Sequence, residues 1–208
     1  RLVLLWYGTW KNTGPSYVPA WVKRDTQRFA RMHMADGSTH SVFSPHGEAT
    51  MQADARAFAA LMRHLAQVDP QHIVVMVQVE NESGSWGLDR DRAPEAEALF
   101  TGPIPAQLAE GLGIARQSWS EAFGPRAAQF FNSWYVARYI DSVAAAGQAE
   151  MNLPMYVNAA LGNAFTDEGG EVGPSGGPNW NALPIWRIAA PYISAFAPDI
   201  YARDPKAV

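Results

Sequence analysis

The sequence contains no cysteine among its 208 residues. Disulfides and thiolate chemistry are therefore excluded, and a zinc site would have to use histidine and carboxylate ligands alone. No stretch approaches the ~20 apolar residues that a membrane-spanning helix needs. A basic surplus is also lacking, because 16 Lys and Arg stand against 20 Asp and Glu. The net charge of -4 gives no reason to expect nucleic acid or an anionic membrane as a partner.

The chain does have the length and apolar content of one sizeable folded domain, because 48% of its residues are hydrophobic. Eight Trp and seven Tyr are many for this length, and flat aromatic faces suit sugars and other ligands that mix apolar and hydroxyl surfaces. Most of these rings are expected to fill the core. The chain begins without Met, on Arg1 and directly in a strand-like run, so we expect a piece of a longer protein.

Strand-like and helical segments alternate along the chain. Apolar runs of strand length lie at residues 1–7, 73–79, 153–160 and 193–201. Helical patterns lie at residues 49–68, 126–150 and 182–192. This alternation predicts an α/β fold with a parallel sheet and helices outside it. Four such units are half of a (β/α)8 TIM barrel, in which the active site sits at the carboxyl ends of the strands.

We expect residues 1–208 to be part of a single catalytic barrel domain with a long loop insertion at about 85–125. This insertion is too long for a simple connection between a strand and a helix, and a short helix is expected in it at 106–111. Long loops in compact domains are usually functional or mobile. A turn is expected at residues 36–38, where Asp, Gly and Ser follow one another.

The most informative stretch is HIVVMVQVENESG at residues 72–84, which changes from an apolar run to Glu80, Asn81 and Glu82. Carboxylates are poor strand formers and costly to bury unpaired, so these acids are expected to face a cavity or solvent. The other three strand ends carry polar or aromatic groups too. These are Trp6, Tyr7, Asn158, Asp199 and Tyr201. All four ends are expected to converge on one face.

The segment VMVQVENESG resembles the fourth-strand motif of the retaining glycoside hydrolases built on eight-stranded barrels. Within that clan it is most similar to the family 35 β-galactosidases, in which this strand typically ends in VQVENEYG. The segment YVPAWV at 17–22 resembles the GLPAWL segment after the family's third strand. PSGGPNWN at 174–181 and APDIY at 197–201 look like a bacterial branch of these enzymes. The resemblance covers essentially the whole chain, as strands 3 to 6.

The resemblance implies that Glu82 is the acid/base of a retaining, double-displacement hydrolysis of terminal β-galactosides. Asn81 would bind the sugar 2-hydroxyl, and Glu80 would be a supporting carboxylate paired with a cation. Family members often have a sugar-contacting Glu in the loop after strand 3, where this chain has TWKNTGP. Asn12, with or without Lys11, would replace that contact, which leaves the identity of the sugar open.

Further substrate-binding residues are expected at Trp6, Asn158 and Tyr201, and the partner is a carbohydrate substrate. The resemblance implies no cofactor and no metal. It places the nucleophile at the end of strand 7, downstream of Val208, so the chain alone is expected to be inactive, with Asp199 orienting the site. Two other functions stay open: another glycosidase of the clan, acting on arabinosides or β-glycans, and a carbohydrate-binding protein without catalysis.

Overall fold

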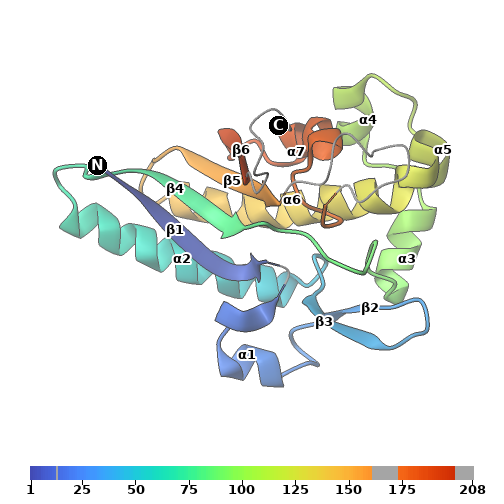
Figure 1. Cartoon of the computed structure of the whole chain (residues 1–208), viewed down its shortest axis with the longest axis horizontal. Coiled ribbons are helices and arrows are strands. Elements are labelled where there is room, and N and C mark those ends of the chain that lie inside the picture. The colour runs from blue at the N-terminus through green and yellow to red at the C-terminus, as the bar shows by residue number, and fades with distance from the viewer. Residues whose placement is uncertain (13, 161–172, 200–208) are drawn as a thin grey trace, which may run out of the picture.

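The computed structural model describes residues 1–12, 14–160 and 173–199 (Figure 1). Their main sheet has four parallel strands, which confirms the strands expected from the sequence. Its order is β1 (Leu2–Lys11), β4 (Val74–Asn81), β5 (Met155–Ala160) and β6 (Ala195–Asp199). The carboxyl ends of these strands therefore lie at one edge of the sheet, as predicted.

Two long helices, α2 (Glu48–Val68) and α6 (Ala127–Gln148), pack side by side on one face of the sheet (Figure 1). They confirm the helices expected at 49–68 and 126–150. Phe58 of α2 and Phe131 of α6 are fully buried in the main core with Val77 and Val79 of β4. A Cβ on Gly147 would lie 2.2 Å from Cε1 of Phe58, so a glycine is what allows the two helices to approach this closely.

The remaining helix of this layer is α7 (Leu183–Ala189), which follows η4 (Trp180–Ala182) and packs against α6. It is shorter than the helix expected at 182–192, because Ala190 leaves the helical conformation. None of the helices among residues 1–12, 14–160 and 173–199 is long and apolar enough to cross a membrane.

An antiparallel ribbon of β2 (Arg31–His33) and β3 (Thr39–Phe43) was not expected from the sequence. The turn between its strands is the one predicted at 36–38, and Gly37 has the positive φ of 83° that the turn requires. The short elements η1 (Pro15–Tyr17) and α1 (Ala20–Arg24) precede the ribbon. They follow β1 and lie below its carboxyl end in the view of Figure 1, and η1 contacts β1.

The insertion after β4 is built from short helices rather than from one long loop, which corrects the sequence expectation. Its elements are α3 (Pro94–Thr101), α4 (Ala106–Leu112), α5 (Trp119–Phe123) and η2 (Gly124–Arg126). Of these, only α4 was predicted, and α5 begins with a capping box between Ser118 and Glu121. A buried aromatic, Trp119, attaches α5 to the main core.

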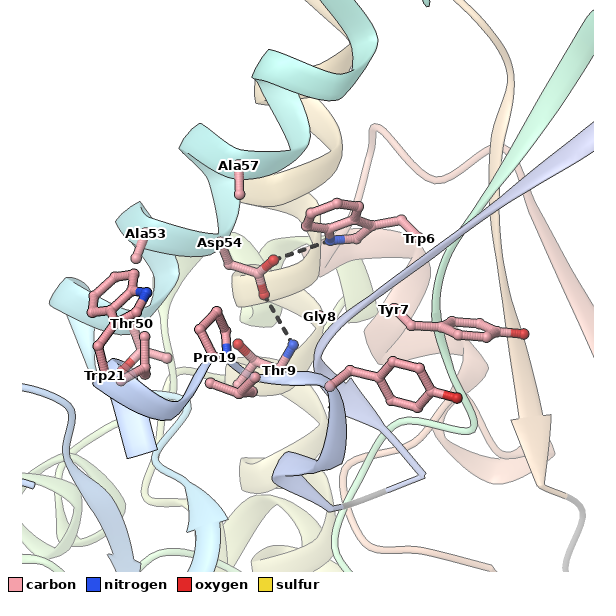
Figure 2. A pocket seen from close by; sticks show the side chains of 13 residues that line it. Trp6, Tyr7, Gly8, Thr9, Pro19, Trp21, Thr50, Ala53, Asp54 and Ala57 are labelled. Carbon is pink, nitrogen blue, oxygen red and sulfur yellow. Dashed lines mark hydrogen bonds between the residues drawn. The ribbon is translucent and has the colours of Figure 1, made fainter. Parts of the chain in front are cut away.

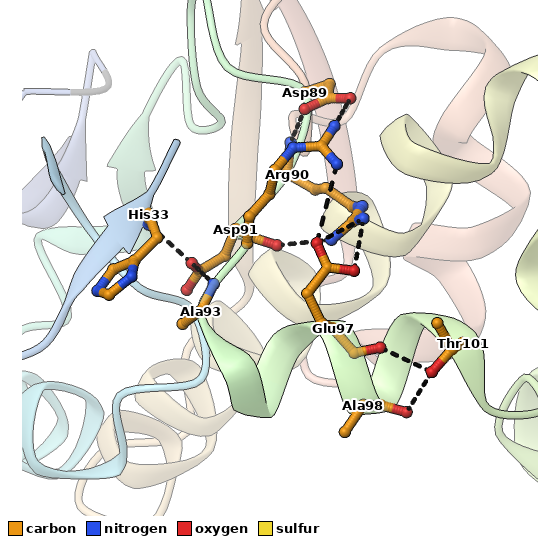
Figure 3. Close-up of polar contacts among 9 residues, drawn as sticks. His33, Asp89, Arg90, Asp91, Ala93, Glu97, Ala98 and Thr101 are labelled. Atoms are coloured by element: carbon orange, nitrogen blue, oxygen red, sulfur yellow. Dashed lines mark hydrogen bonds and ion pairs between the residues drawn. The ribbon is translucent and has the colours of Figure 1, made fainter. Parts of the chain in front are cut away.

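Arg90 fixes the start of the insertion (Figure 3). Its guanidinium is 3.8 Å above the Phe100 ring, and one Nη lies 2.9 Å from the carboxylate of Glu97 on α3. The other Nη donates to the carbonyl oxygen of Asp91 at 2.9 Å. Asp91 in turn accepts the backbone N–H of His33 at 2.8 Å, which joins the insertion to the antiparallel ribbon.

Candidate active site at the carboxyl end of β4

The backbone at the end of β4 turns through left-handed conformations. Glu80 has a φ of 65° and Glu82 a φ of 46°, both of which are uncommon for residues with a side chain. The alternation of side chains along a strand ends there, so Glu80 and Glu82 have different neighbours. Asn12, with a φ of 48°, follows β1 and donates its backbone N–H to the carbonyl of Asn81 at 2.7 Å. Three residues with side chains have a positive φ in one site. Contacts with the surrounding structure must stabilise this unfavourable backbone conformation.

Glu82 is buried at this strand end, with 6% of its surface exposed. Its backbone N–H donates to Oδ1 of Asn158 at 2.9 Å, which fixes the turn against β5. Its carboxylate accepts a hydrogen bond from Nδ2 of Asn12. On its other side the carboxyl group contacts Asp199 of β6. Glu82 is therefore held between the ends of β1, β5 and β6.

The side-chain amides around Glu82 form one hydrogen-bonded chain. Nδ2 of Asn81 donates to Oδ1 of Asn12 at 2.7 Å, and Nδ2 of Asn158 donates to Oδ1 of Asn81 at 3.0 Å. Asn158 also donates to Oδ2 of Asp199 at 2.6 Å. The structure thus brings together four of the residues that the sequence singles out, Glu82, Asn81, Asn12 and Asn158.

Gln78 and Tyr156 belong to the same network, and the sequence reading missed both. Nε2 of Gln78 lies 3.0 Å from Oδ1 of Asn81 and 3.2 Å from Oδ1 of Asn158, and the hydroxyl of Tyr156 donates to Oε1 of Gln78 at 2.8 Å. The signal was the strand period of two. Tyr156 precedes Asn158 by two residues on β5, and Gln78 is a lone amide within the apolar run of β4.

The contact between Glu82 and Asp199 joins two carboxyl groups. Burial raises the pKa of Asp199, and the hydrogen bond with Glu82 and the charge of Glu82 raise it further. The hydrogen bond from Asn158 and the charge of Lys11 oppose this shift. A hydrogen bond between two carboxyl groups requires one proton, so the contact is favourable only while one of the two groups is protonated.

Aromatic rings and one cation flank the amide network. The rings of Tyr7 and Tyr17 meet edge to face at a centroid distance of 5.4 Å, and Nζ of Lys11 lies 5.0 Å from the Tyr7 centroid. Tyr17 is 58% exposed, which leaves its ring available to a ligand. Burial raises the pKa of Tyr7, with smaller contributions from the neighbouring Tyr17 and Asp199.

A cavity of about 170 Å³, which Tyr7 and Tyr17 also line, lies between β1, α1 and α2 (Figure 2). The indole nitrogen of Trp6 donates to Oδ1 of Asp54 at 3.0 Å there, and its ring packs against Phe58 at 5.2 Å. Trp6 therefore faces α2 and is not part of the amide network, so its contact with substrate stays a prediction. Tyr201, the remaining predicted residue, lies outside the described residues.

The prediction that Glu80 pairs with a cation is wrong for the described residues. Its carboxyl group accepts the backbone N–H of Gly8 at 2.9 Å and lies against the carboxyl group of Asp54 on α2. The ion pairs found among residues 1–12, 14–160 and 173–199 include neither of these acids. Within the same ranges, no group of three or more His, Asp or Glu is placed to hold a metal ion.

Comparisons with known proteins bear on the fold. No family model and no curated protein sequence matches the chain. Among solved structures, it is similar to the catalytic domain of β-amylase from Paenibacillus polymyxa, with a TM-score of 0.52 and 11% sequence identity. The match covers 90% of this chain and 58% of that one. At this identity the similarity shows the fold alone, an α/β fold with the parallel sheet and outer helices of a partial (β/α)8 barrel.

Proposed function

We propose that this chain carries the acid/base part of the active site of a retaining glycoside hydrolase. The observation that supports this most is the position of Glu82, a buried carboxyl group at the carboxyl end of a parallel strand, ringed by amides. The active sites of barrel enzymes lie at this edge of the sheet. The similarity to a β-amylase catalytic domain is compatible with a glycosidase.

In this proposal Glu82 gives a proton to the glycosidic oxygen as the bond to the leaving group breaks, and later takes a proton from water. The contact with Asp199, whose pKa is raised by burial and by Glu82, favours a proton shared by the two acids for the first step of this scheme. Asn81 binds the sugar 2-hydroxyl, and its amide does so without competing for the proton. Asn158 holds the backbone of Glu82 and the side chain of Asn81 in a fixed relation.

Asp199 is too close to Glu82 to be the nucleophile. The two carboxyl groups of a retaining pair are about 5–5.5 Å apart, which leaves room for the anomeric carbon between them. Asp199 instead shares a hydrogen bond with Glu82. The proposal therefore gives Asp199 an orienting role and requires a further carboxylate as nucleophile, as the family resemblance implies.

Terminal β-galactosides are the first substrate class to test, because the motif at residues 75–84 resembles that of the family 35 enzymes. Lys11 and Asn12 stand beside the site, where members of that family often have a sugar-contacting Glu. An amide and an ammonium in this place would change which hydroxyl groups are recognised. Aryl β-galactoside, β-glucoside and α-arabinoside should therefore be compared with the same preparation.

The decisive variant is Glu82→Gln in the full-length natural protein. Loss of a general acid should slow hydrolysis of unactivated β-galactosides by about 10²–10⁴-fold. Azide should partly restore turnover of substrates with good leaving groups, because it replaces the water that Glu82 activates. Glu110→Gln, at an exposed position of α4, is the matched control and should leave the rate unchanged. Full activity of the Glu82 variant would refute the assignment.

A second candidate function is carbohydrate binding without catalysis. The chain of amides from Asn12, Asn81 and Asn158 offers donors and acceptors to sugar hydroxyls even if no nucleophile completes the site. Calorimetric titration of the natural protein with galactose and related sugars separates the two functions. Binding with no hydrolysis of any aryl glycoside would favour this second function.

A further inference from the structure

Glu80 and Asp54 form a buried pair of acids beneath the backbone of Gly8. Glu80 is 1% exposed and Asp54 is 7% exposed. A Cβ placed on Gly8 would lie 2.4 Å from Oδ1 of Asp54 and 2.8 Å from Oε1 of Glu80. The two oxygens therefore converge on one point, which only a residue without a side chain leaves open.

The hydrogen-bond donors around this pair are distributed unequally. Asp54 accepts from the indole nitrogen of Trp6 at 3.0 Å and from the backbone N–H of Thr9 at 3.2 Å (Figure 2), and the hydroxyl of Tyr139 lies 3.3 Å from its Oδ2. Glu80 receives the N–H of Gly8 at Oε2, while its buried Oε1 has no donor among the described residues. The donors around Asp54 therefore suit a carboxylate, whereas Oε1 of Glu80 lacks a hydrogen-bond donor among the described residues.

We propose that Glu80 is a neutral carboxylic acid that donates its proton from Oε1 to the carboxylate of Asp54, and that this bond positions the turn carrying Asn81 and Glu82. Two ionised carboxylates in contact without a cation would repel each other in a medium of low dielectric. One proton removes that repulsion and satisfies the oxygen that has no other partner. The bond ties β4 to α2, and its consequence for catalysis rests on the function proposed for Glu82.

The groups that face Glu80 agree with this assignment. Burial raises its pKa well above the ordinary value, and the charge of Asp54 adds to the shift, while the amides of Trp10 and Gly8 oppose it. Tyr139 reaches the pair from α6, and burial together with Asp54 raises its pKa well above the usual range, so it stays neutral. From β1, the contacts to Glu80 come from backbone amides. Among the described residues, β1 and α6 therefore present neutral groups to Glu80, and α2 presents the acid Asp54.

Glu80 is a positioning residue in this scheme. Its backbone is in the left-handed region, and the next two residues are Asn81 and Glu82. A side chain fixed to Asp54 and to the N–H of Gly8 holds that strained turn from the helix side, while Asn158 holds it from the β5 side. Without the proton, the turn would lose its attachment to α2.

The experiment compares Glu80→Gln, Glu80→Ala and Asp54→Asn in the full-length natural protein. We expect Glu80→Ala to lower the hydrolysis rate tenfold or more. An amide at position 80 retains a donor toward Asp54, so Glu80→Gln should fold and keep most of the parent's rate. Both oxygens of Asp54 accept hydrogen bonds, so Asp54→Asn leaves one donor facing an NH2 group and should be the less stable of the two amide variants. Equal losses in Glu80→Gln and Glu80→Ala would overturn the proposal.

Two measurements test the proton without relying on activity. The infrared spectrum at neutral pH should contain a band from a buried neutral carboxylic acid that Glu80→Gln removes and Glu110→Gln retains. The urea midpoint of Glu80→Gln relative to the parent should rise with pH above about 4.3, because an acid with a raised folded pKa loses its contribution as pH rises. Absence of that band, or a relative midpoint that falls with pH, would refute the neutral acid. If the parent hydrolyses no glycoside, the proposed function fails. The infrared and urea results would still show whether Glu80 is protonated.

Discussion

His46 is a half-buried titratable residue whose ring packs among aromatic side chains of α6. Its ring packs 4.3 Å from Tyr135 and 5.5 Å from Phe131, and its Nε2 is buried without a partner among the described residues. Burial lowers the pKa of His46 to about 4, although Asp91 and Glu95 act in the opposite direction. The neutral imidazole is therefore the form that the fold accepts.

This pKa predicts a loss of stability in acid. A group with a lowered folded pKa stabilises the protein fully above its unfolded value near 6.5, and this contribution is lost as pH falls toward 4. His46→Phe keeps an aromatic ring and cannot gain a proton. Relative to this variant, the parent should lose up to ~3 kcal/mol of unfolding free energy across that interval, measured by urea unfolding. His64→Gln, exposed on α2, should show no such difference, and a parallel course of parent and His46→Phe would contradict the prediction.

Among single residues, the sequence indicates those at the strand ends. It does not indicate the residues that hydrogen-bond to them. Glu82 and Asn81 follow an apolar run, and the motif distinguishes them from Glu80. Asp54 could not be found in this way, because an acid in a polar-faced helix reads as solvent exposed. Its contact with Glu80 joins positions 26 residues apart, and it depends on how α2 lies against β1.

At the scale of the element, the crossing of α2 and α6 depends on one glycine. An alanine at Gly147 would place its Cβ 2.2 Å from a ring carbon of Phe58, which is fully buried. We expect Gly147→Ala to destabilise the protein by about 1–3 kcal/mol by overpacking, even though alanine favours helices by about 1 kcal/mol over glycine. Thermal and urea unfolding measure this.

Gly111→Ala in α4 is the matched comparison, because its new Cβ would meet the aliphatic side chain of Ile188, with Cδ1 2.7 Å and Cγ1 2.8 Å away. An aliphatic chain end moves more easily than a buried ring. This variant should be close to neutral, so equal stability of the two alanine variants would show that the α2–α6 contact adapts.

The elements that were predictable are those with long periodic patterns. Helices α2 and α6 have apolar residues at helical spacing over 21 and 22 residues, and residues 74–79 of β4 are apolar except for Gln78. The strand β2 has three residues and α5 has five, which is too short for a period to be visible. Their conformations depend on tertiary contacts, such as the burial of Trp119 and the bond from His33 to Asp91.

At the scale of the whole molecule, β1 is an edge strand of the described sheet with apolar side chains in the open. Leu2, Val3 and Leu5 are 61%, 47% and 45% exposed. Exposed apolar edges pair with other chains. A polypeptide of these 208 residues should therefore associate as its concentration rises, which sedimentation velocity would reveal, and Leu5→Lys should reduce the effect several-fold. Val68→Lys removes an apolar side chain that is 58% exposed at the end of α2, and it should not reduce association. Equal effects of both variants would exclude the edge as the cause.

The left-handed backbone at Asn12, Glu80 and Glu82 has a consequence for laboratory evolution. Glycine adopts this conformation without steric cost, whereas a residue with a side chain pays roughly 1 kcal/mol. A library randomised at position 82 and selected only for heat resistance should therefore enrich glycine and discard the proposed proton donor. Selection for hydrolysis should retain glutamate and accept the lower melting temperature. The two selections should therefore give different residues at position 82. The residue found there would show whether activity or stability was selected.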